Sequence, residues 1–419
     1  MSQVESSHLS QVSRQPDVAG YIHDMAVKAR AAAAGLAKLS AAEKNAALES
    51  IAVALEEDAA AIRAANAVDV ENAKKAGLKE SMIDRLTLTE ARFKAMVDGV
   101  RYVAQLPDPV GELLWTRERP SGITIRKVRV PFGVIAVVFE SRPNVFVDTA
   151  ALCLKTGNAI ILRGGKEAIE SNKALARAVR KGLEGMEGLG SAIQLVEILE
   201  HEAVTELVRS VGFVDVAIPR GGERLIRAMC EAALIPVLKH YKGVCHVYVD
   251  DKADLGMALT ILDNAKTQRT GVCNAAECLL VHERLAPLFL PMVEAWAKDK
   301  KVVLHRQNND WEREFLALEM NVGIVKDYRA AIDHINRYGS HHSDCIVTGD
   351  ETRAKEFLRD VDSAAVYHNV STRFTDGAEF GMGAEIGIST DKLHARGPMG
   401  LEELTTYKYQ ITGEGVIRK

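Results

Sequence analysis

Cysteine is sparse in this sequence, and no long apolar run is present. The chain of 419 residues has six cysteines, at positions 153, 230, 245, 273, 278 and 345. Their scatter argues against a disulfide framework and is typical of free thiols in a reducing compartment. No C-x-x-C pair is present and no histidine pair stands at ligand spacing beside a cysteine, so we expect no metal site. The longest aliphatic run, at 134–139, is too short to span a bilayer.

Basic blocks are also missing. Lys and Arg number 53 against 57 Asp and Glu, a formal net charge of −4, and no stretch interleaves bases with aromatics. This balance argues against a nucleic-acid partner. The N-terminal MSQVESSHLSQVSRQPDV is polar and lacks the apolar segment of a signal peptide, so we expect a cytoplasmic protein without membrane attachment. The length, with 47% hydrophobic residues, predicts two or three globular domains.

The segment 20–105 is rich in alanine and places apolar residues at intervals of three and four, which predicts helices throughout. Capping boxes are expected at Ser40 with Glu43 and at Thr87 with Glu90, because each pairs a hydroxyl with a Glu three residues later. The first part of the chain is therefore predicted to be helical, with a polar tail before it.

Strands begin after the helix-breaking LPDPVGE at 106–112. The stretch TRERPSGITIRKVRVP, at 116–131, predicts a charged hairpin that turns at PSG. From there on, short apolar strands alternate with amphipathic helices, the pattern of a parallel sheet with crossover helices. The last strand of this series is expected at IPVLKHY, residues 235–241. We therefore predict an α/β fold with a doubly wound nucleotide-binding domain.

A second α/β segment is predicted from about residue 248, and a glycine-rich tail with a basic and aromatic end follows from about residue 368. We find no internal repeat and no low-complexity linker. Strands of the second segment are predicted near 278–282, 321–326, 344–348 and 364–369.

Neither G-x-G-x-x-G nor G-x-x-x-x-G-K-[ST] occurs, so a dinucleotide must be held without the two best-known phosphate-binding loops. Two glycine pairs nevertheless stand where strands end and helices begin, in LRGGKEA at 162–168 and in IPRGGERL at 218–225. A helix N-terminus behind such a pair offers N–H groups to an anion. An ordinary turn with surface bases is the competing interpretation. The residues proposed for cofactor binding are Arg163, Gly164, Lys166, Arg220, Gly221 and Gly222.

Cys273 follows the tripeptide RTG, in which Gly271 would allow tight backbone packing that points the thiol into a cleft. A cysteine in apolar surroundings is most often an inert core residue, and Cys278, in the strand-like AECLLVHE, is interpreted that way. The residues alone leave Cys273 open between a structural thiol and a nucleophile.

Five longer blocks add a resemblance: VPFGVIAVVFESRPNV, AIILRGGKEA, NAKTQRTGVCNAAE, VYHNVSTRFTDG and STDKLHARGPMGLEELTTYKY. Together they resemble the γ-glutamyl phosphate reductase family (glutamate-5-semialdehyde dehydrogenases) of the aldehyde dehydrogenase superfamily, over about residues 20 to 415. The resemblance implies an aldehyde-dehydrogenase-like fold. It also implies NADPH-dependent reduction of L-glutamyl 5-phosphate to L-glutamate 5-semialdehyde and phosphate through a cysteine thioester, as the second step of proline biosynthesis.

The resemblance also implies a division of the chain. Residues 1–108 and 129–247 would form the NADPH-binding domain with its N-terminal helices, and residues 248–385 the catalytic domain. Residues 109–128 and 400–419 would form an oligomerisation arm and tail, since relatives place a comparable hairpin against a neighbouring chain. A homodimer or homotetramer is expected, and the upstream glutamate kinase is a further candidate partner.

By the same match, Cys273 takes the position of the catalytic thiol and Asn144 that of the oxyanion-hole asparagine. His240 stands at what resembles the position of the Glu that activates water in hydrolytic relatives, and is either catalytic or only a hydrogen-bonded cleft residue. A reductase gains from losing that Glu, because its thioester must survive until hydride arrives. We expect a nearby base or helix N-terminus to lower the pKa of the thiol. Candidate substrate ligands are Arg142, Ser371, Arg373, His394 and Arg396.

The expected cofactor is NADP(H). Where NAD-using relatives carry a Lys and, three positions later, a Glu for the ribose, this sequence has Arg163 and Lys166, so a base replaces the acid. A positive charge there favours a 2′-phosphate. Two alternatives remain: a CoA-acylating aldehyde dehydrogenase, which also lacks the hydrolytic Glu, and a non-catalytic dinucleotide-binding protein, which would not need both Cys273 and Asn144.

Overall fold

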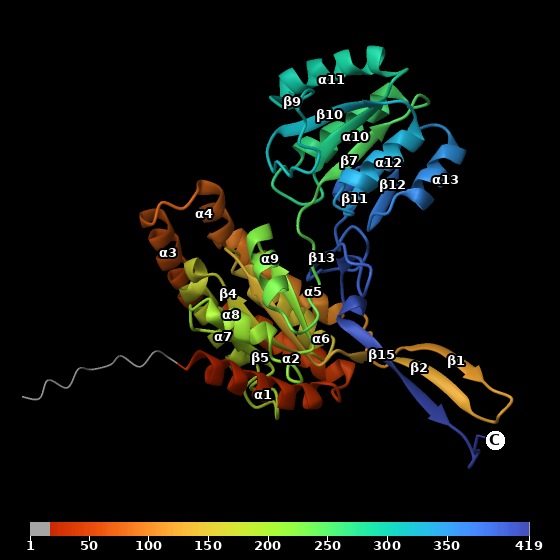
Figure 1. Cartoon of the computed structure of the whole chain (residues 1–419). Helices are drawn as coiled ribbons and strands as arrows, with labels where there is room; N and C mark the ends of the chain where they lie inside the picture. Colours follow the sequence, from red (N-terminus) through yellow and green to blue (C-terminus); the bar gives the residue numbers. More distant parts are fainter. Residues whose placement is uncertain (1–16, 419) are drawn as a thin grey trace, which may run out of the picture.

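The computed structural model describes residues 17–418, which form two lobes and a projecting arm (Figure 1). Within this range no helix is long and apolar enough to cross a membrane. The first lobe contains the N-terminal helices and a four-stranded sheet, and the second contains a six-stranded sheet. The mixed α/β architecture agrees with the fold class that the sequence predicts.

Five helices open the chain, as the alanine-rich pattern predicts. The capping box at Ser40 and Glu43 is confirmed, because Ser40 Oγ accepts from the Glu43 N–H while the Glu43 carboxylate accepts from the Ser40 N–H. The box predicted at Thr87 is wrong: Thr87 Oγ1 donates to the Ile83 carbonyl behind it, and Thr89 caps the next helix. The helices are α1 (Val18–Leu36), α2 (Ala41–Glu57), α3 (Ala59–Lys75), α4 (Glu80–Leu86) and α5 (Glu90–Gln105).

The sheet of the first lobe is parallel, in the order β5-β4-β3-β6, and its middle strands are buried along their whole length. Apolar side chains on both faces of a strand require cover on both faces, which the crossover helices supply. The strands are β3 (Val134–Phe139), β4 (Ala159–Gly164), β5 (Ile193–Leu195) and β6 (Val216–Arg220). The helices are α6 (Asn144–Lys155), α7 (Ile169–Gly182), α8 (Glu202–Val208) and α9 (Glu223–Ala232), with the 3₁₀ turn η1 (Lys166–Ala168) before α7.

The strand predicted at 235–241 is reduced to a single bridge between Val237 and Ala217. The chain leaves the sheet there, because Lys239 turns to other partners: its ammonium group pairs with Asp391 at 3.0 Å and its carbonyl accepts from the Thr390 N–H. The segment then crosses to the second lobe.

The sheet of the second lobe is also parallel, in the order β12-β11-β7-β8-β10-β9. All four strands predicted for this segment are confirmed, whereas β7 and the three-residue β9 were not among the predicted strands. The strands are β7 (Cys245–Val249), β8 (Ala276–His282), β9 (Val303–His305), β10 (Glu319–Val325), β11 (Ser343–Val347) and β12 (Ala365–His368). The helices are α10 (Leu255–Thr267), α11 (Ala286–Lys300), α12 (Tyr328–Tyr338) and α13 (Glu351–Asp360).

The predicted hairpin is confirmed as β1 (Leu113–Glu118) and β2 (Thr124–Pro131), and the C-terminal β15 (Thr405–Thr412) adds a third antiparallel strand. Figure 1 shows this arm extending away from both lobes. Before β15 the chain returns between the lobes through η2 (Thr372–Phe374), the short pair β13 (Gly387–Ser389) and β14 (Gly397–Met399), and η3 (Glu402–Leu404).

Candidate active site

Cys273 lies in the loop between α10 and β8, and both ends of that loop are anchored. Lys266, near the end of α10, forms an ion pair of 2.9 Å with Glu277 of β8, and both side chains are fully buried. Breaking a pair of this kind would leave one charge buried and unpaired, which is strongly unfavourable. Beside the thiol, Asn274 Nδ2 donates to the Thr375 carbonyl at 2.8 Å, and Thr372 Oγ1 donates to the Asn274 carbonyl at 2.7 Å. The loop is therefore held at its ends and in its middle.

The backbone of Cys273 is closely approached by Gly243, on the segment that crosses between the lobes. A Cβ on Gly243 would overlap the Cys273 carbonyl oxygen and lie 2.5 Å from the carbonyl carbon and 2.7 Å from Cα. A Cβ on Gly271 would meet only Arg85 Nη2, at an ordinary 3.6 Å. The expectation that Gly271 provides the tight backbone packing is therefore wrong, and Gly243 has that role.

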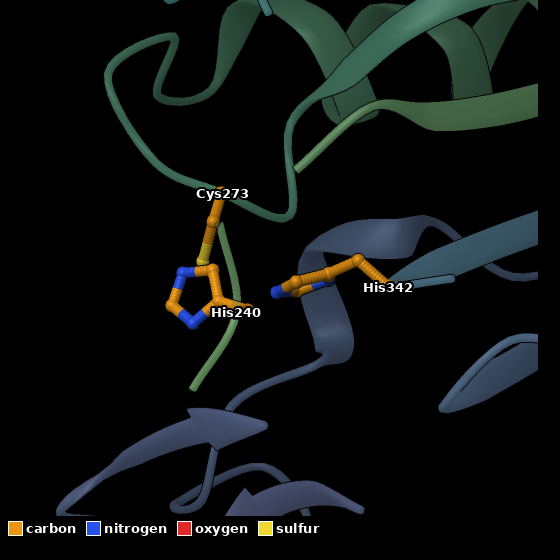
Figure 2. A group of neighbouring side chains, drawn as sticks. All are labelled: His240, Cys273 and His342. Carbon is orange, nitrogen blue, oxygen red and sulfur yellow. The ribbon is translucent and has the colours of Figure 1, made fainter. Parts of the chain in front are cut away.

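Two imidazoles lie beside the thiol. Figure 2 shows the three side chains pointing toward one another. Cys273 comes from the loop between α10 and β8, His240 from the segment that crosses between the lobes, and His342 from the residue just before β11. One donor atom on each side chain lies within 4.8 Å of the other two. His240 is held by a hydrogen bond of 2.7 Å from Nδ1 to the Ile388 carbonyl. His342, which the sequence reasoning did not select, is fully buried.

The charge states of this group follow from its burial. Burial raises the pKa of the Cys273 thiol to about 12, with Arg220 acting in the opposite direction. Burial also lowers the pKa of His240, and that of His342 to about 3. The expected lowering of the thiol pKa is thus wrong for the ligand-free protein, because desolvation outweighs the nearby positive charge. At neutral pH a protonated thiol faces two neutral imidazoles.

Arginines gather near the thiol. Burial, together with the charges of Arg85, Arg220 and Arg269, lowers the pKa of Arg142 to about 10. Arg373 lies near Arg269 and Cys273 as well, and it donates through Nε to Gln268 at 2.8 Å. None of Arg85, Arg142, Arg220 and Arg269 has an ion-pair partner among residues 17–418. Unpaired guanidinium groups held together repel one another, so an anion bound among them would be stabilised.

The remaining predicted substrate ligands are engaged elsewhere. His394 Nε2 is bonded to the Glu403 carbonyl at 2.8 Å, and Arg396 pairs with Asp362 at 2.8 Å. Ser371 caps η2, accepting from the Arg373 N–H at 3.3 Å. The structure therefore connects Arg142 and Arg373 with the thiol, and it gives His394, Arg396 and Ser371 local structural partners.

Asn144 is the first residue of α6, and its Nδ2 donates to Asp148 Oδ2 one turn later, at 2.8 Å. Burial raises the pKa of Asp148 to about 6 and also raises that of Glu385. These two acids line a cavity of about 230 Å³ together with Gly99, Val103, Ala151 and Ala384. Arg220 lowers the pKa of both acids and of the thiol, so its guanidinium group lies among all three. Sequence patterns did not reveal either acid, because neither stands in a recognisable motif.

The two glycine turns lie at the carboxyl ends of β4 and β6. Arg163 is buried, and it donates to the carbonyls of Gly164 at 3.1 Å and Leu199 at 3.0 Å. Lys166, two residues beyond Gly164, is exposed. A Cβ on Gly164 would overlap the Asn172 amide, so this turn requires glycine.

At the second turn, Glu140 accepts from the Gly222 N–H at 2.9 Å. A Cβ on Gly221 would lie 2.5 Å from the same carboxylate. Helix α9 therefore already has a carboxylate at its N-terminus, while Lys166 of the first turn faces solvent.

Comparisons with known proteins agree on one family. The model of the aldehyde dehydrogenase family matches residues 11–311. A γ-glutamyl phosphate reductase from Desulforamulus reducens is 51% identical over 411 residues, which are 95% of this chain and 99% of the relative. The crystal structure of γ-glutamyl phosphate reductase from Thermotoga maritima is 43% identical and superimposes with a TM-score of 0.93, covering 95% of this chain and all of the other. An acetylating aldehyde dehydrogenase from Geobacillus thermoglucosidasius shares the fold at 16% identity, with a TM-score of 0.69 over 96% of this chain and 98% of its own.

Because Gly243 contacts the Cys273 backbone and Gly271 does not, replacing each with alanine should lower the reaction rate by different amounts. Gly243→Ala must displace the Cys273 backbone. If the thiol is the reacting group, a shift of about 1 Å should cost on the order of a hundredfold in rate. Gly271→Ala is the matched control and should keep most of the rate, because its Cβ would make only an ordinary van der Waals contact with Arg85. Measuring kcat together with thermal unfolding separates misplacement of the thiol from loss of the fold. Equal rates for the two variants would contradict the assigned contact.

Proposed function

This chain belongs to the aldehyde dehydrogenase family, and we infer that it reduces L-glutamyl 5-phosphate to L-glutamate 5-semialdehyde with release of phosphate. This is the second step of proline biosynthesis. The observation that carries this function is the 51% identity to a γ-glutamyl phosphate reductase over nearly the whole of both chains. The acetylating relative supports only the fold, so a CoA-acylating reaction is not favoured.

We propose that Cys273 is the nucleophile and that His240 takes its proton. The hydrogen bond from His240 Nδ1 to the Ile388 carbonyl fixes the proton on Nδ1 and leaves the lone pair of Nε2 free. A neutral imidazole with a free lone pair can accept the thiol proton as sulfur attacks the acyl carbon. Phosphate then leaves with the electrons of the acyl–oxygen bond, and a thioester remains on Cys273.

Asn144 is proposed to stabilise the oxyanion together with the Cys273 N–H. Its amide is oriented by Asp148, and an amide held in place before reaction needs no reorganisation as charge develops. A histidine at position 240, rather than a carboxylate, suits this chemistry, because a carboxylate there would activate water and hydrolyse the thioester.

The arginines beside the thiol are proposed to bind the anionic groups of the substrate. Arg85, Arg142, Arg269 and Arg373 provide more positive charge than the nearby acids neutralise. The phosphate and the α-carboxylate are the substrate's two anionic groups, and guanidinium groups bind both in bidentate fashion. The cavity lined by Asp148 and Glu385 suits the substrate's α-ammonium group.

The cleanest test of this function is the reverse reaction, phosphate-dependent reduction of NADP⁺ by glutamate 5-semialdehyde. Cys273→Ala should lose at least about a thousandfold in rate, because no other group can form the thioester, while dinucleotide affinity stays near normal. Cys278→Ala, on the adjacent strand, is the matched control and should keep the wild-type mechanism. Substantial phosphate-dependent turnover by Cys273→Ala would rule out the covalent route.

We further propose that NADP(H) is the nicotinamide cofactor and that it supplies the hydride when bound. The glycine turn at Gly164, which has no room for a side chain, and the exposed Lys166 fit a nucleotide phosphate. Arg163 would hold the turn in place through its hydrogen bonds to the carbonyls of Gly164 and Leu199. Lys166 would then be the base that attracts the 2′-phosphate.

Reversing the charge at Lys166 tests this assignment. Lys166→Glu should weaken NADPH binding by roughly 1–3 kcal/mol, the size of a charge-assisted hydrogen bond, and weaken NADH binding much less. Titration of each nucleotide by calorimetry measures the difference. Lys38→Glu, at an exposed site beyond α1, controls for the change in net charge. Equal losses for both nucleotides would show that Lys166 does not contact the 2′-phosphate.

The arm of β1, β2 and β15 is proposed to bind a second copy of this chain. The outer strand β15 exposes Tyr407, Tyr409 and Ile411 at 48%, 51% and 60%. A three-stranded ribbon with exposed apolar side chains and open edges is marginal in water unless a partner covers it. A homodimer or homotetramer would provide that cover. The cytoplasmic location and the contact with a glutamate kinase stay predictions.

Solution mass by light scattering tests the arm. The wild-type chain should be a dimer or tetramer, and the double variant Tyr409→Asp, Ile411→Asp should dissociate because it places charge on the exposed face. Leu288→Asp, at a site on α11 that is 65% exposed, is the control and should keep the wild-type mass. A monomeric wild-type chain would contradict the assembly role.

A further inference from the structure

The side chains of Cys273, His240 and His342 form what we call the thiol–imidazole cluster. Their three donor atoms lie within 4.8 Å of one another, and they come from three separate segments (Figure 2). The reaction proposed above uses the thiol and one imidazole. His342 has no role in it, although it is fully buried and points into the same space.

His342 carries a second, independent signal. Its Nε2 is buried and has no hydrogen-bond partner among the described residues. A buried polar atom without a partner is unfavourable, and a ligand, a water or an ion at that atom would relieve the cost. The unpartnered nitrogen belongs to the ring that faces His240 and Cys273 (Figure 2).

The hydrogen bonds of the two rings leave lone pairs on the atoms that face the cluster. His240 Nδ1 donates to the Ile388 carbonyl, which leaves Nε2 as an acceptor. His342 Nδ1 is 2.9 Å from Ser343 Oγ, and Ser343 Oγ is 2.6 Å from Thr375 Oγ1. When His342 Nδ1 donates to Ser343 Oγ, the proton is on Nδ1 and Nε2 carries a lone pair. The opposite assignment would place an N–H on Nε2, where it would be buried without an acceptor, and buried N–H groups without an acceptor are rare.

We propose that the thiol–imidazole cluster is a reversible binding site for a thiophilic divalent cation, with Zn²⁺ as the best fit. Sulfur and imidazole nitrogen are the ligands that Zn²⁺ prefers, and bonds of about 2.0–2.3 Å require only a small inward movement of three side chains. When Zn²⁺ binds, the thiol proton is released to solvent and the thiolate sulfur donates a lone pair to the metal. Three protein ligands leave a fourth position open to water. The hydrogen bond from His240 to Ile388 is the usual support of a zinc-binding imidazole.

A second acidic and imidazole group, formed by Asp250, Asp251 and His282, is a poorer metal site. Arg353 lies against both carboxylates, 2.9 Å from Asp250 Oδ2 and in contact with Asp251. A guanidinium group already neutralises these acids, so a cation would have to displace it. His282 therefore provides a control for non-specific metal binding.

Metal binding and catalysis are linked but can be tested separately. Because Cys273 is the proposed nucleophile, bound Zn²⁺ should inhibit the reductase, and this consequence depends on the proposed function. Binding itself does not depend on it. A cation bound to Cys273 in a protein that shows no reductase activity would leave the metal site intact and remove the proposed function.

Spectroscopy of Co²⁺ added to the full-length protein provides the direct test. The wild type should show a thiolate-to-cobalt charge-transfer band and the intense visible bands of a tetrahedral site, at one equivalent, and Zn²⁺ should abolish them. Cys273→Ser should lose the charge-transfer band, and His342→Gln should bind roughly tenfold more weakly or worse. His282→Gln should match the wild type. Should His342→Gln fail to fold, judged by circular dichroism, His240→Gln replaces it with the same expectation.

Alkylation of the thiol gives a second readout. Saturating Zn²⁺ should slow the modification of Cys273 by iodoacetamide at least about tenfold, and a chelator should restore the rate. Alkylation at an unchanged rate, or a charge-transfer band that survives in Cys273→Ser, would overturn the proposal. Unchanged cobalt affinity in both folded histidine variants would overturn it as well, because the imidazoles would then not be ligands.

Discussion

The contact between Gly243 and the backbone of Cys273 is the constraint on which the site depends. Gly243 lies on the segment that leaves the first sheet, and Cys273 lies on a loop of the second, so this contact sets the thiol against the inter-lobe segment. The same segment brings His240 to the thiol and Lys239 to Asp391, and the Gly243 N–H is held by Glu314 at 2.8 Å. The absence of a Cβ at Gly243 therefore allows the Cys273 loop and the segment that carries His240 to lie in close contact.

The charges around that volume are unbalanced in a way that suits an anionic substrate. Selection for stability alone would favour arginines that are paired with acids, because a buried charge without a partner is unfavourable. Arg353 shows that solution in the second lobe, where it binds Asp250 and Asp251. Near Cys273, Arg142 has no such partner among the described residues, and burial together with three neighbouring arginines lowers its pKa to about 10. A bound phosphate or carboxylate would relieve the repulsion among these guanidinium groups, so the arrangement favours an anionic substrate.

Sequence patterns predicted the regular parts of this molecule well, because each depends on local periodicity. The N-terminal helices, the buried strands and the hairpin all follow from spacing within a few residues. The strand expected at 235–241 failed because Lys239 is drawn to Asp391, far along the chain. The site was harder to predict for the same reason. Cys273 and Arg142 belong to recognisable sequence motifs, whereas His342, Glu385 and Arg85 are brought to this site only by the fold. Glycine was expected to matter at position 271 because it adjoins the cysteine, whereas the close contact comes from Gly243, which the crossing of the lobes brings there.

The resting state of the thiol connects the chemistry with the proposed metal site. A thiol whose pKa is raised to about 12 is protonated at neutral pH and therefore resists alkylation and oxidation, which act on the thiolate. In the proposed mechanism the proton is removed as the sulfur attacks, and the lone pair on His240 Nε2 would accept it. A cation competes for that same sulfur and that same lone pair. Under the proposed mechanism, susceptibility to a thiophilic metal follows from placing two imidazoles beside the sulfur.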